Sequence, residues 1–241
     1  MTKTIKGIIF DLDGTLYDPF WPGLVSLKAC FELAEKKGFI CDSRRQRLKR
    51  KINGEELYSY KFWKTIFEED SKNTGSDEFP LSLIFKKAWF DMDEKKDECC
   101  DYLERVWYKV FYEKIRPFPW VHKTMKELEE NGFRIGMISD SPVTFGKKKI
   151  RALRLDNYFD LNNTIWTKEL GYKKPSKHSF IKMCEMMDSN PYELLVIGDV
   201  YHKDGSGARN AEMNFLPVSS NCDFNYFLKR LWDVVGGKGN E

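Results

Sequence analysis

The chain has 241 residues, of which 41% are hydrophobic and 32% are charged, and its formal net charge is +3. That length allows one large or two small globular domains with a buried core. So small a net charge does not indicate a nucleic-acid or membrane partner, and no apolar stretch approaches the roughly 20 residues that span a bilayer.

Cysteine usage and the amino terminus both favour a cytoplasmic protein. The six cysteines are scattered through the sequence, without the paired short spacings of a zinc site or a redox motif. We expect all six to be reduced thiols, as is usual inside cells. The first apolar run is only a few residues long, which is too short for a signal peptide.

Residues 5–10 form a short, β-branched apolar run that ends abruptly at two acids, Asp11 and Asp13, and a Gly14-Thr15 turn. Such a run, closed by turn residues, predicts a buried strand. The acids would then lie at its carboxyl end, where ligands bind in open α/β sheets. Two neighbouring carboxylates are costly to bury unless a cation or a shared proton relieves their repulsion. On this stretch alone, a buried site and a solvated acidic turn both stay open.

Residues 18–116 have a different character, with long, charged and aromatic-rich patterns typical of helices. Proline and glycine signals delimit a helix over 22–37, apolar spacing predicts another over 95–115, and 72–80 is expected to be a loop. The basic run at 44–51 is predicted to be helical. It could contact an anionic partner, but a solvated helix face is the simpler interpretation.

The carboxyl-terminal half, from residue 117 onward, alternates short apolar runs with amphipathic patterns. The runs predict strands and the amphipathic patterns predict helices, with strands at 135–139, 164–167, 194–198 and 215–218, helices at 121–131, 145–155, 177–187, 207–213 and 223–235, and a loose tail at 236–241. Alternation of this kind implies a parallel sheet with right-handed crossovers. The predicted fold class is therefore α/β. A Rossmann-like parallel five-stranded core is formed by 1–17 and 117–241, and an all-helical domain, 18–116, is inserted into it.

Polar residues follow three of the later predicted elements, as the two acids follow the first strand. They are Ser139, Lys174, and Asp199 with Asp204. The carboxyl ends of parallel strands share one sheet edge, so these groups should gather there. In order, the four segments FDLDGTL, ISDSP, GYKKPSKHSF and VIGDVYHKD resemble the four motifs of the haloacid dehalogenase superfamily. The resemblance is closest to its phosphatase branch, in which a helical cap is inserted after the first motif.

The resemblance implies a role for each acid. Asp11 would be the nucleophile that forms an aspartyl-phosphate, and Asp13 the acid and base that serves the leaving group and the attacking water. Four acids together require a divalent cation, and Mg²⁺ prefers a few carboxylates plus water and substrate oxygens. The family pattern implies metal ligation by Asp11, the backbone carbonyl of Asp13, and Asp199. Asp204 would act directly or through water.

The remaining motif residues are expected to hold the phosphate. Ser139, Asp140 and the backbone amides that follow would bind a phosphate oxygen. The family pattern places its lysine directly before a proline, which selects Lys174, whose ammonium would offset carboxylate repulsion and stabilise charge on the transferring group. Thr15, in the first turn, is expected to support the site.

The predicted function is that of a Mg²⁺-dependent phosphatase that hydrolyses a small phosphomonoester, with the inserted domain acting as a lid that selects the substrate. Two alternatives stay open. A phosphomutase would use the same nucleophile but pass the phosphoryl group to a second substrate hydroxyl. A catalytically inactive module would instead bind a partner through the basic helix at 44–51.

Overall fold

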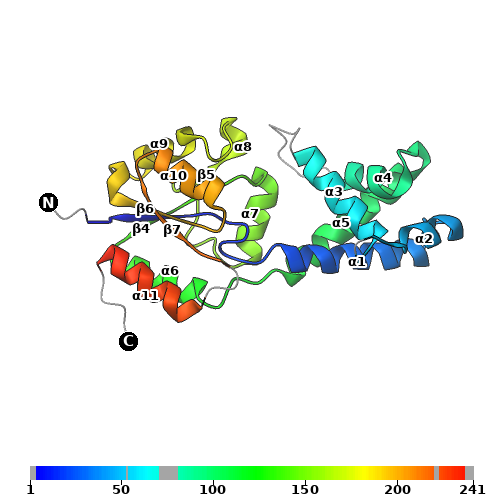
Figure 1. Cartoon of the computed structure of the whole chain (residues 1–241), viewed down its shortest axis with the longest axis horizontal. Helices are drawn as coiled ribbons and strands as arrows, with labels where there is room; N and C mark the ends of the chain where they lie inside the picture. The colour runs from blue at the N-terminus through cyan, green and yellow to red at the C-terminus, as the bar shows by residue number, and fades with distance from the viewer. Residues whose placement is uncertain (1–3, 53, 71–80, 220–222, 237–241) are drawn as a thin grey trace. The chain divides into compact units, whose positions relative to one another are not determined.

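The chain forms two compact units. One, the core unit, comprises Met1–Pro19 and Ile115–Glu241, and the other, the inserted unit, comprises Phe20–Lys114. The computed structural model describes residues 4–52, 54–70, 81–219 and 223–236 (Figure 1). The loop expected at 72–80 and, apart from Gly236, the tail expected at 236–241 lie outside the described residues.

The core unit is built on a five-stranded sheet with the order β5-β4-β1-β6-β7, in which every neighbouring pair is parallel. This confirms the predicted fold class. The strands are β1 (Gly7–Phe10), β4 (Arg134–Ser139), β5 (Thr164–Trp166), β6 (Leu194–Gly198) and β7 (Asn214–Pro217). The central strand is buried on both faces, as its uninterrupted apolar sequence requires.

The register of the sheet places the polar residues that follow the strands at one edge. Phe10 at the end of β1 is paired with Met137 of β4 on one side and with Ile197 of β6 on the other. The amide of Asp11 continues this ladder, donating to the carbonyl of Ile197 at 2.9 Å. The residues that follow β1, β4 and β6 are therefore brought together at the carboxyl edge.

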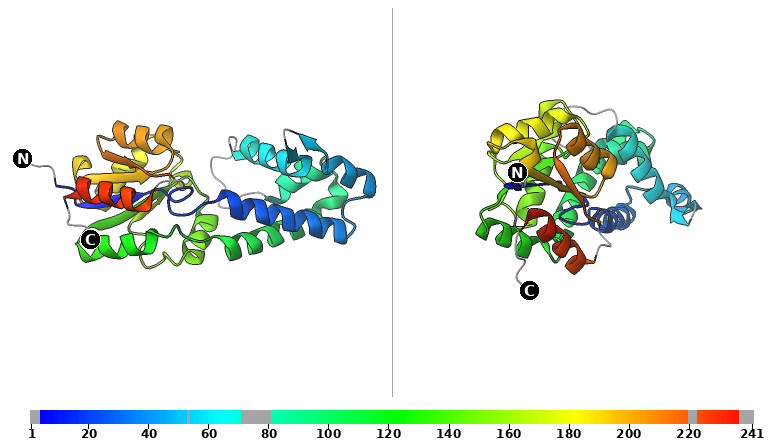
Figure 2. Two further views of the ribbon diagram at one scale, coloured as in Figure 1. Left: turned by 60° about the horizontal axis from the view of Figure 1, so that its bottom comes forward. Right: turned by 60° about the vertical axis from the view of Figure 1, so that its left-hand side comes forward.

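Helices cover both faces of the sheet (Figures 1 and 2). They are α6 (Val121–Glu130), α7 (Val143–Ala152), α8 (Thr167–Leu170), α9 (Lys177–Met186), α10 (Ser206–Asn210) and α11 (Phe224–Val235), with a 3-10 turn at Pro191–Glu193 and a π-helical turn at Tyr201–Gly205. Each helix expected after residue 117 overlaps one of them. The short helix α8 and the π-helical turn were not predicted.

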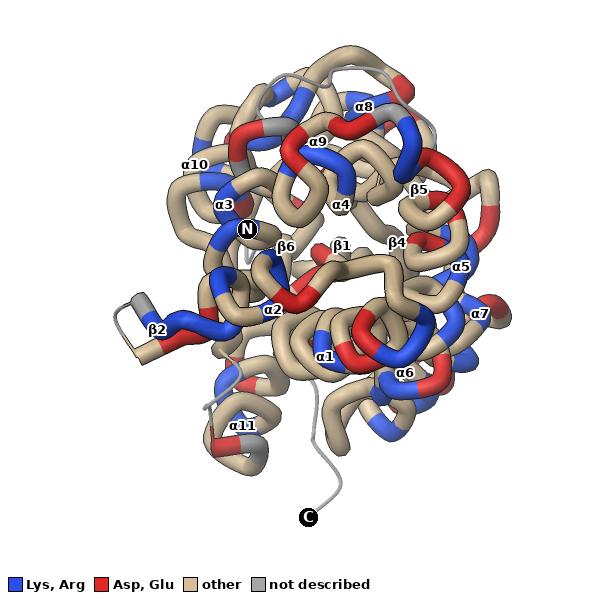
Figure 3. The backbone as a smooth tube through the Cα atoms, turned by 90° about the vertical axis from the view of Figure 1, so that its right-hand side faces the viewer, with Lys and Arg blue, Asp and Glu red and all other residues tan. Residues whose placement is uncertain are grey.

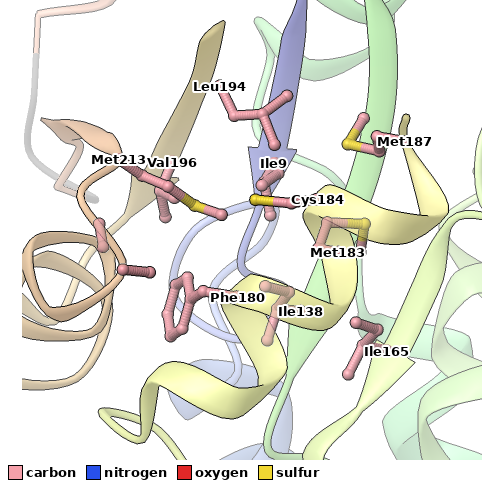
Figure 4. Packing of buried hydrophobic residues seen from close by; sticks show 12 residues of the cluster. Ile9, Ile138, Ile165, Phe180, Met183, Cys184, Met187, Leu194, Val196 and Met213 are labelled. Carbon is pink, nitrogen blue, oxygen red and sulfur yellow. The ribbon is translucent and has the colours of Figure 1, made fainter. Parts of the chain in front are cut away.

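One core cluster fills the space between the sheet, α9 and α10 (Figure 4). Phe180 of α9 is fully buried there among side chains of β1, β4 and β6. Gly207 of α10 approaches it so closely that a Cβ atom would lie 2.2 Å from the ring. On the opposite face, the Trp120 ring centroid lies 6.4 Å from that of Phe10 and 4.9 Å from that of Phe227 in α11.

The inserted unit is mainly helical, and aromatic side chains form its core. Its helices are α1 (Phe20–Lys36), α2 (Asp42–Leu48), α3 (Leu57–Asp70), α4 (Leu81–Phe90) and α5 (Asp97–Lys114), with a 3-10 turn at Glu94–Lys96. Phe31 stacks on Tyr58 at 4.1 Å between ring centroids, and the indole of Trp89 donates to the backbone carbonyl of Tyr58 at 3.0 Å. These contacts tie α1, α3 and α4 into one bundle.

The basic helix predicted at 44–51 is shorter than expected. Helix α2 ends at Leu48, and the chain then forms a short antiparallel pair, β2 (Lys51–Ile52) with β3 (Glu55–Glu56). Gly54, with φ +87°, lies in the connection, where a side chain would be strained. The pair adds a feature to the inserted unit that the sequence did not predict, and it carries charges of both signs (Figure 3).

Two expectations about cysteines and membranes concern the whole chain. Among the described residues, five cysteines are free thiols, namely Cys30, Cys41, Cys99, Cys100 and Cys184. Cys222 lies outside the described residues. Within the described part of the chain, none of the helices combines the length and the apolar character needed to cross a bilayer.

The core cluster gives a direct test of the packing. Replacing Phe180 by Ala should lower the free energy of unfolding by about 3–5 kcal/mol, because the change removes apolar contacts and leaves a cavity. The adjacent Ile181 is 40% exposed, so Ile181→Ala is the matched control and should cost much less. Urea denaturation followed by circular dichroism measures both. Equal losses for the two variants would contradict the described packing.

Candidate active site

Residues from separate segments of the core unit meet at the carboxyl edge of the sheet. Asp11 directly follows β1, Asp199 directly follows β6, and Ser139 is the last residue of β4. Asp204 lies in the π-helical turn after β6, and Lys174 lies in the loop between α8 and α9. The parallel register explains why residues so far apart in sequence become neighbours.

The ammonium of Lys174 links two of the buried acids. Its Nζ lies 2.5 Å from Oδ1 of Asp11 and 2.6 Å from Oδ1 of Asp204, and it also donates to the backbone carbonyl of Ile138 at 3.3 Å. The Lys174 side chain is only 3% exposed. Its three donor positions are thus all used inside the protein, which fixes the ammonium between the two carboxylates.

The titration of these groups reflects their burial and their mutual contacts. Burial alone would lower the pKa of Lys174, but the carboxylates of Asp11 and Asp204 outweigh it and raise this pKa above its ordinary value. Burial raises the pKa of Asp11 to about 7, with repulsion from Asp204 adding to the increase and Lys174 opposing it. A metal ion beside Asp11 would lower the pKa of this carboxyl and keep it ionised.

Thr15 joins the first and last motifs through its fully buried hydroxyl. Its Oγ1 lies 3.1 Å from Oδ2 of Asp11 and 3.2 Å from Oδ1 of Asp199, and it accepts the backbone amide of Asp199 at 3.1 Å. Gly14 makes this approach possible, because a Cβ atom there would lie 2.3 Å from Oδ2 of Asp199 and its φ is +86°. The Gly14-Thr15 turn therefore packs directly onto the Asp199 side chain.

Three carboxylates form a group that could hold a cation. Oxygens of Asp11, Asp199 and Asp204 lie within 4.8 Å of one another. Asp199 is exposed and the other two are buried, so the group opens to solvent on one side. Carboxylate oxygens with one open side fit a small hard divalent cation, which retains water or substrate oxygens in its coordination shell.

The carboxylate of Asp13 has a different set of partners. Nζ of Lys149 in α7 lies 2.7 Å from both of its oxygens, and the Ser141 hydroxyl donates to Oδ2 at 2.7 Å. The Tyr17 hydroxyl donates to Oδ1. Burial would raise the pKa of Asp13, but the Lys149 ammonium reverses this and the pKa is lowered. Asp11 and Asp13 are thus each paired with a different lysine, Lys174 and Lys149 respectively.

Lys149 and Ser141 were not predicted. Lys149 belongs to a run of three lysines, of which Lys147 and Lys148 are exposed and only the third is buried. Gly146 and Ile150, which are also buried, lie on the same helix. The amphipathic pattern of this helix could have indicated that one lysine of the run faces inward, but its partner depends on tertiary contacts.

The second motif supports the site through Ser139 and Asp140. Ser139 is fully buried, and its Oγ accepts the backbone amide of Ser141 at 3.1 Å. The Asp140 carboxylate accepts the Thr167 hydroxyl at 2.6 Å and the backbone amide of Lys174 at 3.1 Å. The side chain of Asp140 therefore holds the loop that carries Lys174, and its predicted part in substrate binding would fall to its backbone amide.

Comparison with known proteins identifies the family. Residues 5–212 match the model of the haloacid dehalogenase-like hydrolases. The chain belongs to this family. The family prediction made from the four motifs is confirmed, and the protein is an enzyme of the hydrolase class.

Two named relatives align with this chain over most of their length. The chain is 24% identical over 217 residues to a glyceraldehyde 3-phosphate phosphatase of Methanothermobacter thermautotrophicus, with 90% of this chain and 86% of the relative covered. It is 25% identical over 216 residues to a phosphoglycolate phosphatase of Nitrosospira multiformis, with 86% and 80% covered.

Solved structures show that the fold is shared. The HAD-hydrolase YfnB from Bacillus subtilis gives a TM-score of 0.67 at 18% identity, with 97% of this chain and all of that one covered. A HAD phosphatase from Thermococcus onnurineus gives a TM-score of 0.64 at 22% identity, with 97% and 99% covered.

The position of Lys174 between two buried acids leads to a prediction about stability. Lys174→Met should lower the free energy of unfolding by about 3–5 kcal/mol near neutral pH, because it leaves the carboxylates of Asp11 and Asp204 without their cation. The loss should be smaller at acid pH. A carboxyl whose pKa is higher in the folded chain binds its proton more tightly when folded, so its stabilising contribution is lost as pH rises through the folded pKa.

Urea denaturation at about pH 5 and about pH 8 measures this dependence. Lys177, which is exposed at the start of α9, gives the matched control Lys177→Met. We expect the control to change stability little at either pH. A Lys174→Met loss that is the same at both pH values would contradict the electrostatic role assigned to this lysine.

Proposed function

We propose that this hydrolase is a Mg²⁺-dependent phosphatase that hydrolyses a small phosphomonoester through an aspartyl-phosphate. The observation that carries the proposal is the setting of Asp11. Its carboxylate lies against the Lys174 ammonium and within the acidic group that includes Asp199, and the chain places Asp13 two residues away. A nucleophile, a charge-stabilising cation and an acid–base group are thus supplied by one sheet edge.

In the first step, an oxygen of Asp11 forms a bond to phosphorus while the bond from phosphorus to the leaving oxygen breaks. Asp13, in its protonated form, gives its proton to that oxygen. In the second step, water attacks the phosphorus of the aspartyl-phosphate, its proton passes to Asp13, and the bond to Asp11 breaks to release phosphate. Ser139 and the amide of Asp140 would hold the phosphoryl oxygens during both steps, and Lys174 would supply positive charge beside Asp11.

The metal ligands in this proposal are Asp11, Asp199 and the backbone carbonyl of Asp13, with Asp204 acting directly or through water. When bound, Mg²⁺ supplies positive charge that offsets the charge of the phosphoryl oxygens and of the carboxylates. Thr15 supports this arrangement because its hydroxyl contacts both Asp11 and Asp199. The donor set of acidic oxygens favours a hard cation over a softer transition metal.

The substrate class is inferred from the named relatives. They are called phosphatases of glyceraldehyde 3-phosphate and phosphoglycolate, which favours a small phosphorylated carbon compound and hydrolysis over a phosphomutase reaction. We assign substrate selection to the inserted domain, residues 18–116, because the four motifs lie outside it. The free thiols of the described cysteines suit a reducing compartment such as the cytoplasm.

The alternative of an inactive binding module has less support. The basic side chains at 44–51 are largely paired within the inserted unit. Arg47 lies 2.8 Å from Asp91, and Lys49 lies 2.8 Å from Glu35. Because these charges already have partners within the inserted unit, we favour a solvated helix face over a nucleic-acid-binding surface.

The proposal is tested by assaying release of inorganic phosphate from a panel of phosphomonoesters. With Mg²⁺ present, the protein should release phosphate from at least one small ester. Excess chelator should abolish this activity and added Mg²⁺ should restore it, because the acidic group needs a cation to accept a phosphate dianion. Ca²⁺ should restore it poorly, since its looser coordination would not hold Asp11 in line with the phosphorus.

The Asp11→Asn variant, assayed in the same preparation, reports any contaminating phosphatase, because it should have no activity of its own. Circular dichroism checks that it folds. Full activity in excess chelator would contradict the metal dependence. Product that stays phosphorylated, with no free phosphate released, would instead indicate a phosphomutase.

A further inference from the structure

A buried lysine lies beside the proposed acid–base group, outside the four motifs. The Lys149 side chain is 1% exposed, and its Nζ lies 2.7 Å from each carboxylate oxygen of Asp13, whose side chain is 35% exposed. Lys149 has no part in the two steps proposed for the reaction. Burying an ammonium is costly, so the Lys149 side chain needs the Asp13 carboxylate as its partner at this position.

The contacts of Asp13 leave its carboxylate little freedom. An ionised carboxylate offers about four lone-pair positions. Here Oδ1 accepts from Tyr17 and Lys149, and Oδ2 accepts from Ser141 and Lys149. Both oxygens of the ionised carboxylate are therefore held, by the Lys149 ammonium and by two hydroxyls. Protonation of Asp13 would displace one of these donors and leave the others to hold the group.

Lys149 is itself fixed by the packing of α7. Its ammonium lies 4.3 Å from the centroid of the Phe145 ring, one helical turn earlier, a distance at which a cation is attracted to an aromatic face. It also contacts the Ser141 hydroxyl, and a Cβ atom at Gly146 would lie 2.0 Å from the ring of Trp166. The helix therefore lies close against the sheet, and the ammonium is held at a defined point.

We propose that Lys149 is a positioning residue that, with Ser141, orients the Asp13 carboxylate for proton transfer to the leaving-group oxygen. This inference rests on the proposed function. Proton transfer requires heavy atoms within hydrogen-bond reach, and a misplacement of about 1 Å can cost about 10²-fold in rate. Loss of Lys149 should therefore slow only those substrates whose leaving group must be protonated.

The test compares two substrates in the first turnover, before hydrolysis of the phosphorylated enzyme limits the rate. With Lys149→Met, release of the alcohol from an alkyl phosphate should slow by about 10²-fold. Release of an acidic phenol from an aryl phosphate should change by less than about 5-fold, because such a leaving group needs little protonation. Rapid quench measures both, and KM should be nearly unchanged for each substrate.

Three further variants sharpen the comparison. Lys147 lies on the same helix but is exposed, so Lys147→Met is the matched control and should leave both rates unchanged. Lys149→Arg keeps the positive charge and should recover part of the alkyl phosphate rate. If Lys149→Met does not fold, Ser141→Ala removes the Ser141 contact to the same carboxylate and should give the same selective loss, smaller in size.

The outcomes separate this inference from the proposed function. Wild-type protein that hydrolyses neither ester with Mg²⁺ present would contradict the proposed function itself. If the wild-type protein hydrolyses both, an equal loss on the two substrates, or no loss on either, would overturn the role given to Lys149. A loss confined to the alkyl phosphate would support it.

Discussion

One buried ammonium holds the site together. Lys174 contacts Asp11 and Asp204, two carboxylates that would otherwise repel each other in a region with little water. The repulsion between like charges at such distances is large when they are buried, so the fold depends on a cation here. The loop that carries Lys174 is held in turn by Asp140, and the turn that carries Asp204 begins three residues after the end of β6. The carboxyl edge of the sheet, where we propose that catalysis takes place, is therefore also a point of structural stability.

The two acids of the first motif differ because their surroundings differ. Burial and the neighbouring Asp204 raise the pKa of Asp11 to about 7, whereas the Lys149 ammonium lowers the pKa of Asp13. In pairs of acids that divide the tasks of nucleophile and acid–base group, the nucleophile is the one that stays ionised. A cation held by Asp11 and Asp199 would lower the pKa of Asp11 and favour its anionic form. The proposed division of work therefore depends on that cation, because the described residues alone raise the pKa of the proposed nucleophile and lower the pKa of the proposed acid–base group.

Much of this could be predicted from sequence, because the informative patterns are local. The buried strand before Asp11 and the turn after it lie within a dozen residues, and the parallel sheet follows from regular alternation of strands and helices. The positions of Ser139, Lys174 and Asp199 at one edge follow from the same topology.

The features that could not be predicted depend on tertiary contacts. Nothing in a run of three lysines says which acid Lys149 would meet, because the two are distant in sequence. The carboxylate of Asp140 accepts hydrogen bonds from the Thr167 hydroxyl and the backbone amide of Lys174. These partners come together only when the loop that carries Lys174 has folded. The strands of the β2–β3 pair, Lys51–Ile52 and Glu55–Glu56, are too short to leave an alternating pattern in the sequence.

The central claim is that Asp11 becomes phosphorylated during turnover. The most direct measurement is acid quench of an Asp13→Asn variant after mixing with an activated aryl phosphate and Mg²⁺, followed by peptide mapping with mass spectrometry. The variant should still be attacked at phosphorus but should lack the base for hydrolysis, so phosphorylated protein should accumulate. We predict the phosphoryl group on Asp11. Its presence on another residue, or turnover with no phosphorylated protein at any time, would contradict the mechanism.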